Sequence, residues 1–215
     1  ATWRSPFDIE RHGYGYGMPL VSPLKNATLA EVHAFPWPDP EWMDVSHIRD
    51  EARQYEHEYA ILGGEWSPFW HDAIDLLDFD GLIYQMYDDP EVVDAVMMYT
   101  SEYYLAVSRR IFEAVGDAID IFFIGNDFGA QTGPMLSPPL FRRFVLPHLQ
   151  KFADLGHEFG KRVVLHTDGS LRPLLPDMIA IGLDGIQSVQ PYCTGMALDG
   201  LKRDFGHDLT FMGCV

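Results

Sequence analysis

Cysteine, basic residues and long apolar runs are all scarce in this sequence. Two cysteines, Cys193 and Cys214, occur in 215 residues, too few for a disulfide framework, which favours a reducing compartment. No apolar run reaches the about 18 residues of a membrane-spanning helix, and the first residues contain no apolar signal core. These absences predict a cytoplasmic protein.

The shortage of basic residues limits the kinds of partner that the protein is expected to bind. Lys and Arg number 15 against 32 Asp and Glu, which gives a formal net charge of −17. A surface this acidic repels phosphate backbones and anionic lipids, so neither nucleic acid nor membrane is expected as a partner. Hydrophobic residues make up 47% of the chain and charged residues 22%, the balance of an ordinary globular protein. A small-molecule enzyme or a binding domain fits this composition.

Residues 1–45 are rich in proline, tryptophan and glycine and show little periodicity. Thr28 and Glu31 have the spacing of a capping box and predict a short helix after them. A cluster of three prolines further on excludes a helix there. This region is therefore predicted to be an extended arm with one short helix, held on the body by Trp37 and Trp42, with a disordered tail as the alternative.

From residue 46 onward, apolar strands alternate with helical patterns. The predicted strands are 60–64, 119–124, 162–165, 185–189 and 209–212. The longest predicted helix starts at Asp89-Pro90 and ends near Gly116, and another opens at Ser137 and is interrupted by Pro147. Alternation of this kind is typical of a parallel sheet covered by helices, so the fold class is α/β.

Five strands are too few for a closed barrel of eight. A (β/α)8 TIM barrel also has typically ~250 residues, and this sequence stops directly after a strand. We therefore expect residues 1–215 to be one barrel domain, incomplete in this chain, with its central portion present and both ends truncated. The alternative is a smaller open sheet whose edge is covered by a second copy, which would give a homo-oligomer.

Polar residues follow each predicted strand. In parallel α/β folds the working groups lie at the carboxyl ends of the strands. The residues found there, in chain order, are Glu65, Trp66, Asn126, Asp127, His166, Asp168, Gln187, Gln190 and Cys214. We expect them to share one rim.

His166 and Asp168 are the most informative pair on this rim. Two positions apart on an extended chain, their side chains can point the same way, and an imidazole beside a carboxylate suits metal binding or proton transfer. Asp168 could instead cap the next helix. Asp127 is a candidate base or orienting group, and Cys214 is either a thiolate ligand for zinc or an apolar filler. The predicted catalytic residues are Asp127, His166 and Asp168, and the predicted metal ligands are His166, Asp168 and Cys214.

The loop after residue 125 carries Gly129 and Gly133 among polar residues. Glycines in such a loop indicate unusual backbone angles or close approach of the backbone to a ligand. The predicted substrate-binding residues are Glu65, Trp66, Asn126, Gln131, Gln187 and Gln190.

Several segments together resemble the uroporphyrinogen decarboxylase superfamily. They are Asn126–Phe144, His166–Ser170, Gly182–Gln190 and 195–206, and the resemblance extends over nearly the whole chain. It implies a (β/α)8 barrel whose complete members continue beyond both ends of this sequence.

The superfamily implies two competing activities. Its decarboxylases remove acetate carboxylates from a tetrapyrrole in porphyrin biosynthesis, without a cofactor, using an arginine-rich N-terminal segment and an aspartate that lie outside these residues. Its methyltransferases move methyl groups between a corrinoid protein and a thiol or pterin, using zinc held by a His-x-Cys pair and a later cysteine. His166 matches that histidine, but Asp168 replaces the cysteine, which makes a harder ligand set.

The loop sequence favours the second activity, because Asn126-Asp127-Phe128-Gly129 stands where the decarboxylases have a Phe-Glu-Ser-Trp-type stretch. Charge is a further discriminator. A tetrapyrrole with many carboxylates needs several convergent cations, and 11 arginines and four lysines supply them only if clustered. The resemblance thus implies metal-assisted methyl transfer, with zinc and a partner's corrinoid as cofactors and a small molecule or corrinoid protein as partner. Decarboxylation and a non-catalytic binding module are the alternatives.

Overall fold

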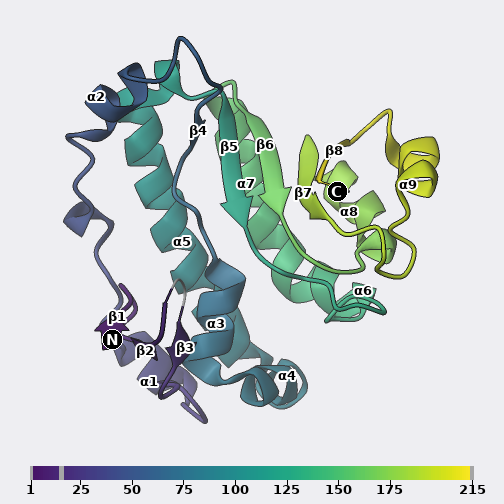
Figure 1. Cartoon of the computed structure of the whole chain (residues 1–215). Helices are drawn as coiled ribbons and strands as arrows, with labels where there is room; N and C mark the ends of the chain where they lie inside the picture. The colour runs from purple at the N-terminus through teal and green to yellow at the C-terminus, as the bar shows by residue number, and fades with distance from the viewer. Residues whose placement is uncertain (1, 15–16, 214–215) are drawn as a thin grey trace.

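Five parallel strands form the central sheet of the computed structural model, which describes residues 2–14 and 17–213 (Figure 1). In spatial and chain order they are β4 (Leu62–Gly63), β5 (Ile121–Gly125), β6 (Arg162–His166), β7 (Gly185–Val189) and β8 (Thr210–Gly213). The predicted α/β class is confirmed, and the arrangement is that of part of a TIM barrel.

Helices cover one face of this sheet. The main helices of the chain are α3 (Phe69–Leu77), α4 (Phe79–Asp88), α5 (Pro90–Val115), α7 (Leu146–Glu158), α8 (Leu175–Ala180) and α9 (Leu198–Phe205), with 3-10 turns η2 (Gly116–Ala118) and η4 (Arg172–Leu174) before β5 and α8. Of these, α3 and α4 pack on α5 beyond the end of the sheet. Alternate side chains of β5 point to opposite faces. Phe122 is fully buried against Phe112 of α5 and Phe152 of α7, whereas Phe123 on the opposite face is half-buried. None of the described helices is long and apolar enough to cross a membrane.

The helix predicted after Ser137 is interrupted at Pro147, as expected. It consists of α6 (Pro138–Leu140), a π-helical turn (Phe141–Val145) and then α7. In the π turn the N–H of Leu146 donates to the carbonyl of Phe141, five residues back. Because Pro147 has no N–H, it fits only in the first turn of a new helix, and the wider turn makes α7 start just before it.

The N-terminal region differs from the predicted arm. Three short strands, β1 (Thr2–Arg4), β2 (Glu10–His12) and β3 (Met18–Pro19), form an antiparallel sheet. Strands of two or three residues are too short for an alternating pattern to stand out, which is why the sequence did not indicate them. Beside this sheet, α1 (Leu29–Ala34) has the predicted capping box, with Thr28 and Glu31 bonded reciprocally.

Of the two tryptophans expected to hold the N-terminal region, only Trp37 does so. Its ring stacks on Tyr99 of α5 at 4.6 Å between centroids, and its Nε1 donates to Val32 O at 2.9 Å. Trp42 closes the short 3-10 turn η1 (Pro40–Trp42) and is 73% exposed, so that part of the prediction is wrong. The helix α2 (Ile48–Arg53) follows before β4.

Candidate functional site

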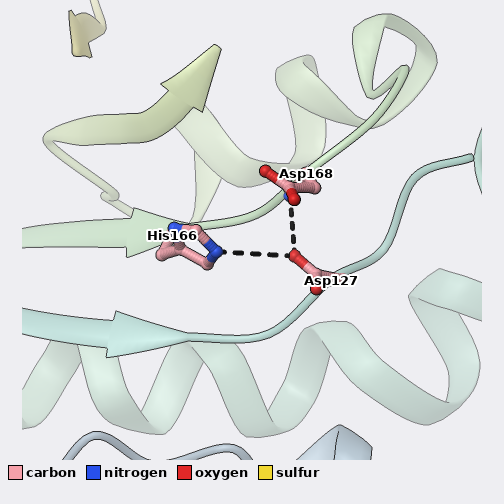
Figure 2. A group of neighbouring side chains, drawn as sticks. All are labelled: Asp127, His166 and Asp168. Atoms are coloured by element: carbon pink, nitrogen blue, oxygen red, sulfur yellow. Dashed lines mark hydrogen bonds and ion pairs between the residues drawn. The ribbon is translucent and has the colours of Figure 1, made fainter. Parts of the chain in front are cut away.

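Asp127, His166 and Asp168 meet at the carboxyl ends of β5 and β6 (Figure 2). Each is half-buried and offers one ligand atom, and these three atoms all lie within 4.8 Å of one another. His166 Nε2 is 3.7 Å from Asp127 Oδ1, and the backbone N–H of Asp168 donates to the same oxygen at 2.8 Å. The structure thus brings the three residues of the predicted catalytic set together.

The neighbouring strand fixes the ring of His166. Gln187 is paired with His166 in the register of β6 and β7, and its Oε1 accepts a hydrogen bond from His166 Nδ1. With the proton on Nδ1, the lone pair of Nε2 is directed toward Asp127. The indole of Trp66 packs at 5.4 Å from the imidazole, over Gly125, where a Cβ would collide with the indole.

Asp168 is held by an irregularity in β7. The strand register shifts between Gln187 and Val189, and Ser188 between them has a φ of +73°. In this conformation Ser188 Oγ donates to Asp168 Oδ1 at 2.5 Å. Left-handed backbone at a non-glycine residue costs of order 1–3 kcal/mol, and bulges often redirect a side chain next to a functional site. No pattern in the sequence indicated Ser188 as a site residue.

His71 of α3 supports Asp127 from the other side. Its Nε2 accepts the backbone N–H of Asp127 at 3.1 Å, so that nitrogen carries a lone pair. Burial lowers the pKa of His71 below its usual range, which keeps the ring neutral at pH 7. The 3.7 Å approach of Asp127 Oδ2 to the same nitrogen is therefore not an ion pair. In the sequence, His71 follows the first predicted strand, a position from which it could line a ligand pocket.

The two loops that carry the aspartates pack back to back. A Cβ on Gly129 would lie 2.6 Å from the carbonyl oxygen of Asp168, and Gly169, with a φ of +86°, abuts Gly129 in the same way. Ser170 N donates to Ala130 O at 2.8 Å across this contact. The close backbone approach expected at Gly129 is therefore to the second loop, not to a ligand.

Asn126 has a different role from the predicted one. It has no exposed surface, its Oδ1 accepts the N–H of Trp70 at 2.9 Å, and its Nδ2 donates to Ser67 O at 3.0 Å. Both ends of the amide are used to hold the start of α3 against β5. Asn126 thus positions the site and offers no group to a substrate.

The remaining predicted residues are spread more widely. Gln190 Oε1 accepts the N–H of Gly169 at 3.1 Å, which ties it to the Asp168 loop, whereas Gln131 is exposed. Glu65 lines a separate cavity of about 180 Å³ with Asp72, and burial raises its pKa. Cys214 lies outside the described residues.

The donor set fits a divalent metal. One imidazole nitrogen and two carboxylates supply three ligands and leave an open position, as in catalytic zinc sites. Gln187 and Ser188 orient two of these ligands in the way that outer hydrogen bonds do in metal sites. Asp127 joins His166 and Asp168 in this set, and the predicted ligand Cys214 lies outside the described residues. The arrangement is oxygen-rich and so less selective for a thiol-binding metal than a cysteine set.

Comparison with known proteins identifies one matching family model and several similar proteins. The family model described as uroporphyrinogen decarboxylase (URO-D) matches residues 13–213. The uroporphyrinogen decarboxylases of Geobacter sp. (strain M21) and Citrifermentans bemidjiense are each 29% identical over 147 residues, covering 64% of this chain and 40% of theirs. A solved methyltransferase from Methanosarcina mazei aligns with a TM-score of 0.59 and 24% identity, over 75% of this chain and 45% of its own. The chain spans less than half the length of these proteins.

Proposed function

The chain belongs to the uroporphyrinogen decarboxylase family, and from that premise we propose that it carries out metal-assisted methyl transfer between a corrinoid protein and a thiol or pterin acceptor. The observation that carries this proposal is the convergence of Asp127, His166 and Asp168 with their ligand atoms within 4.8 Å. The fold likeness to a methyltransferase is in line with it. We place this activity in the cytoplasm.

In this proposal His166 Nε2 and one oxygen from each aspartate would hold zinc. A zinc ion there would act as a Lewis acid that lowers the pKa of a bound thiol or hydroxyl. The chain's own residues supply orientation: Gln187 keeps the proton of His166 on Nδ1, and Ser188 holds one oxygen of Asp168. Trp66 forms an apolar wall beside the imidazole.

Decarboxylation of a tetrapyrrole is the second candidate. The 29% identity to two uroporphyrinogen decarboxylases over 147 residues favours it. In that case Asp127 would face the substrate without a metal, and cations would be needed around the acetate groups. A binding module without turnover is the third reading.

Metal analysis of the purified protein tests the proposal. After dialysis against zinc, we expect about one ion per chain, and His166→Ala should abolish the stoichiometric binding. His57→Ala is the matched control, because His57 is 89% exposed and lies far along the chain from the site. No zinc in the wild type, or equal zinc in both variants, would contradict the proposal. Tetrapyrrole decarboxylation that survives Asp168→Ala would establish the second candidate instead.

A further inference from the structure

A cavity of about 780 Å³ lies between the N-terminal sheet and helix α3. Its apolar walls are formed by Met18, Leu20 and Val21 on one side and by Ile74 and Phe79 on the other. The volume is within the about 300–1,000 Å³ of typical small-molecule sites, which are also mostly apolar. The cavity can therefore hold a molecule of two or more rings.

One residue joins this cavity to the candidate metal site. His71 lines the cavity, and its Nε2 accepts the backbone N–H of Asp127 at 3.1 Å. The imidazole of His71 thus stands between the cavity and Asp127, which is not itself part of the lining. The separate cavity that Glu65 lines has only about 180 Å³, which is too small for a substrate of that size.

The charges that line the large cavity are balanced. Lys25 Nζ is 2.6 Å from Asp78 Oδ2, and the buried guanidinium of Arg11 bonds to Asp75 and lies 3.6 Å from Asp72. Each cation of the lining thus faces a carboxylate of the protein.

We propose that this cavity is the binding chamber of an uncharged, largely apolar small molecule and that His71 is the link between this chamber and Asp127. That the bound molecule is a substrate of the candidate metal site rests on the proposed function. Carboxylates are bound strongly where cations converge without other partners, and here both cations already neutralise protein carboxylates. The chamber is accordingly a poor site for a tetrapyrrole bearing many carboxylates.

A pair of probes that differ in charge tests this inference. We use 2-methoxynaphthalene and 2-naphthoate, which are similar in shape, and measure their dissociation constants by fluorescence titration at pH 7.5. The wild type should bind the uncharged ether at least about tenfold more tightly than the carboxylate. Leu20→Glu should weaken binding of the ether, because it places a charge on an apolar wall. Leu198→Glu, at a residue of α9 that is 38% exposed, is the matched control and should leave both constants unchanged.

A second variant tests whether the cavity binds a carboxylate more tightly once Lys25 loses its ion-pair partner. Asp78→Asn leaves Lys25 without its closest carboxylate while keeping a side-chain acceptor for the N–H of Asp80 at the start of α4. It should increase the affinity for 2-naphthoate by up to about fivefold, as expected for release of one half-exposed cation, and leave the affinity for the ether unchanged.

Three outcomes would overturn the inference: equal or tighter binding of 2-naphthoate by the wild type, tight binding of uroporphyrin I that Leu20→Glu removes, or no binding of either probe. If neither probe binds, sedimentation of the same samples would show whether a second copy of the chain covers the cavity. That result also overturns the inference. Zinc content is measured in parallel. Ether binding without zinc overturns the proposed function alone, and zinc without ether binding overturns the inference alone.

Discussion

His166 Nε2 and Asp127 Oδ1 lie 3.7 Å apart at the ends of two neighbouring strands, β6 and β5. This separation exceeds that of a hydrogen bond. It is close to the about 3.4 Å expected between two ligands of one tetrahedral zinc ion with bonds of about 2.0–2.1 Å. The pair is thus arranged for a shared ion with little movement of either side chain.

Removal of either carboxylate charge should weaken zinc binding. Asp127→Asn and Asp168→Asn should each lower the zinc affinity by at least about 10- to 100-fold, the size of effects seen even for outer hydrogen bonds in metal sites. Competition titration with a chromophoric chelator measures this loss. Asp154→Asn, at an exposed residue of α7, is the control and should bind zinc as the wild type does. A wild-type affinity in Asp127→Asn would remove that residue from the ligand set.

Gln187 should affect affinity without being a ligand. Its Oε1 accepts from His166 Nδ1, so Gln187→Leu should reduce zinc affinity about 10- to 100-fold while the limiting stoichiometry stays the same. Gln187→Glu keeps an acceptor at that position and should retain the affinity. The same chelator titration, continued to saturation, separates the two quantities. If Leu and Glu behave alike, the hydrogen bond does not orient the imidazole.

The contact between the two loops should make Gly129 intolerant of a side chain. A Cβ there would lie 2.6 Å from the carbonyl oxygen of Asp168, so Gly129→Ala should lower the free energy of unfolding by about 1–3 kcal/mol through overpacking. Gly133→Ala, in the same loop, is the control: a Cβ there has no atom within 4 Å, and its effect should stay within about 0.5 kcal/mol. Urea denaturation of both variants measures the difference, and equal stabilities would show that the loops separate easily.

His148 should make the stability depend on pH. It is half-buried against Ser101 and Phe69, and burial, together with the charge of Lys151, lowers its pKa to about 4. The carboxylates of Glu102 and Asp94 act in the opposite direction with less effect. Because the unfolded chain takes up this proton near pH 6.5 and the folded chain near pH 4, the contribution of His148 is complete above pH 6.5 and is lost as pH falls toward 4.

The loss associated with His148 is at most about 3 kcal/mol. Urea denaturation of the wild type and of His148→Asn between pH 4 and 7.5 measures it as a difference, since the other titrating groups are common to both proteins. The variant should have the shallower pH dependence. Parallel curves for the two proteins would mean that His148 titrates normally.

The sequence predicted the sheet well because its strands are strongly marked. The strand predicted at 162–165 is Arg162–His166 in the structure, and that predicted at 185–189 is unchanged. Parallel strands bring their carboxyl ends to one edge, so the meeting of His166 and Asp168 with Asp127 followed from residue order alone.

What the sequence could not predict depends on local backbone geometry. The strand β4 ends at Gly63, and Gly64 and Ser67 have φ values of +83° and +59°. The chain therefore turns before Glu65, and the alternating side-chain directions of the strand do not extend to this residue. For this reason Glu65 lies in a separate cavity from the three clustered residues. The burial of Asn126 and the bulge at Ser188 likewise arise from contacts between distant segments, which no local pattern encodes.

The left-handed backbone of Ser188 lowers the stability of the fold, while the side chain of the same residue holds Asp168 in the candidate site. Glycine is the residue best suited to a φ of +73°, so replacing the serine would relieve strain and make the protein harder to unfold. The same replacement would remove the hydrogen bond from Ser188 Oγ to the carboxylate of Asp168. Screening for heat resistance alone would therefore tend to select against the working enzyme at this position, a conflict common at functional sites.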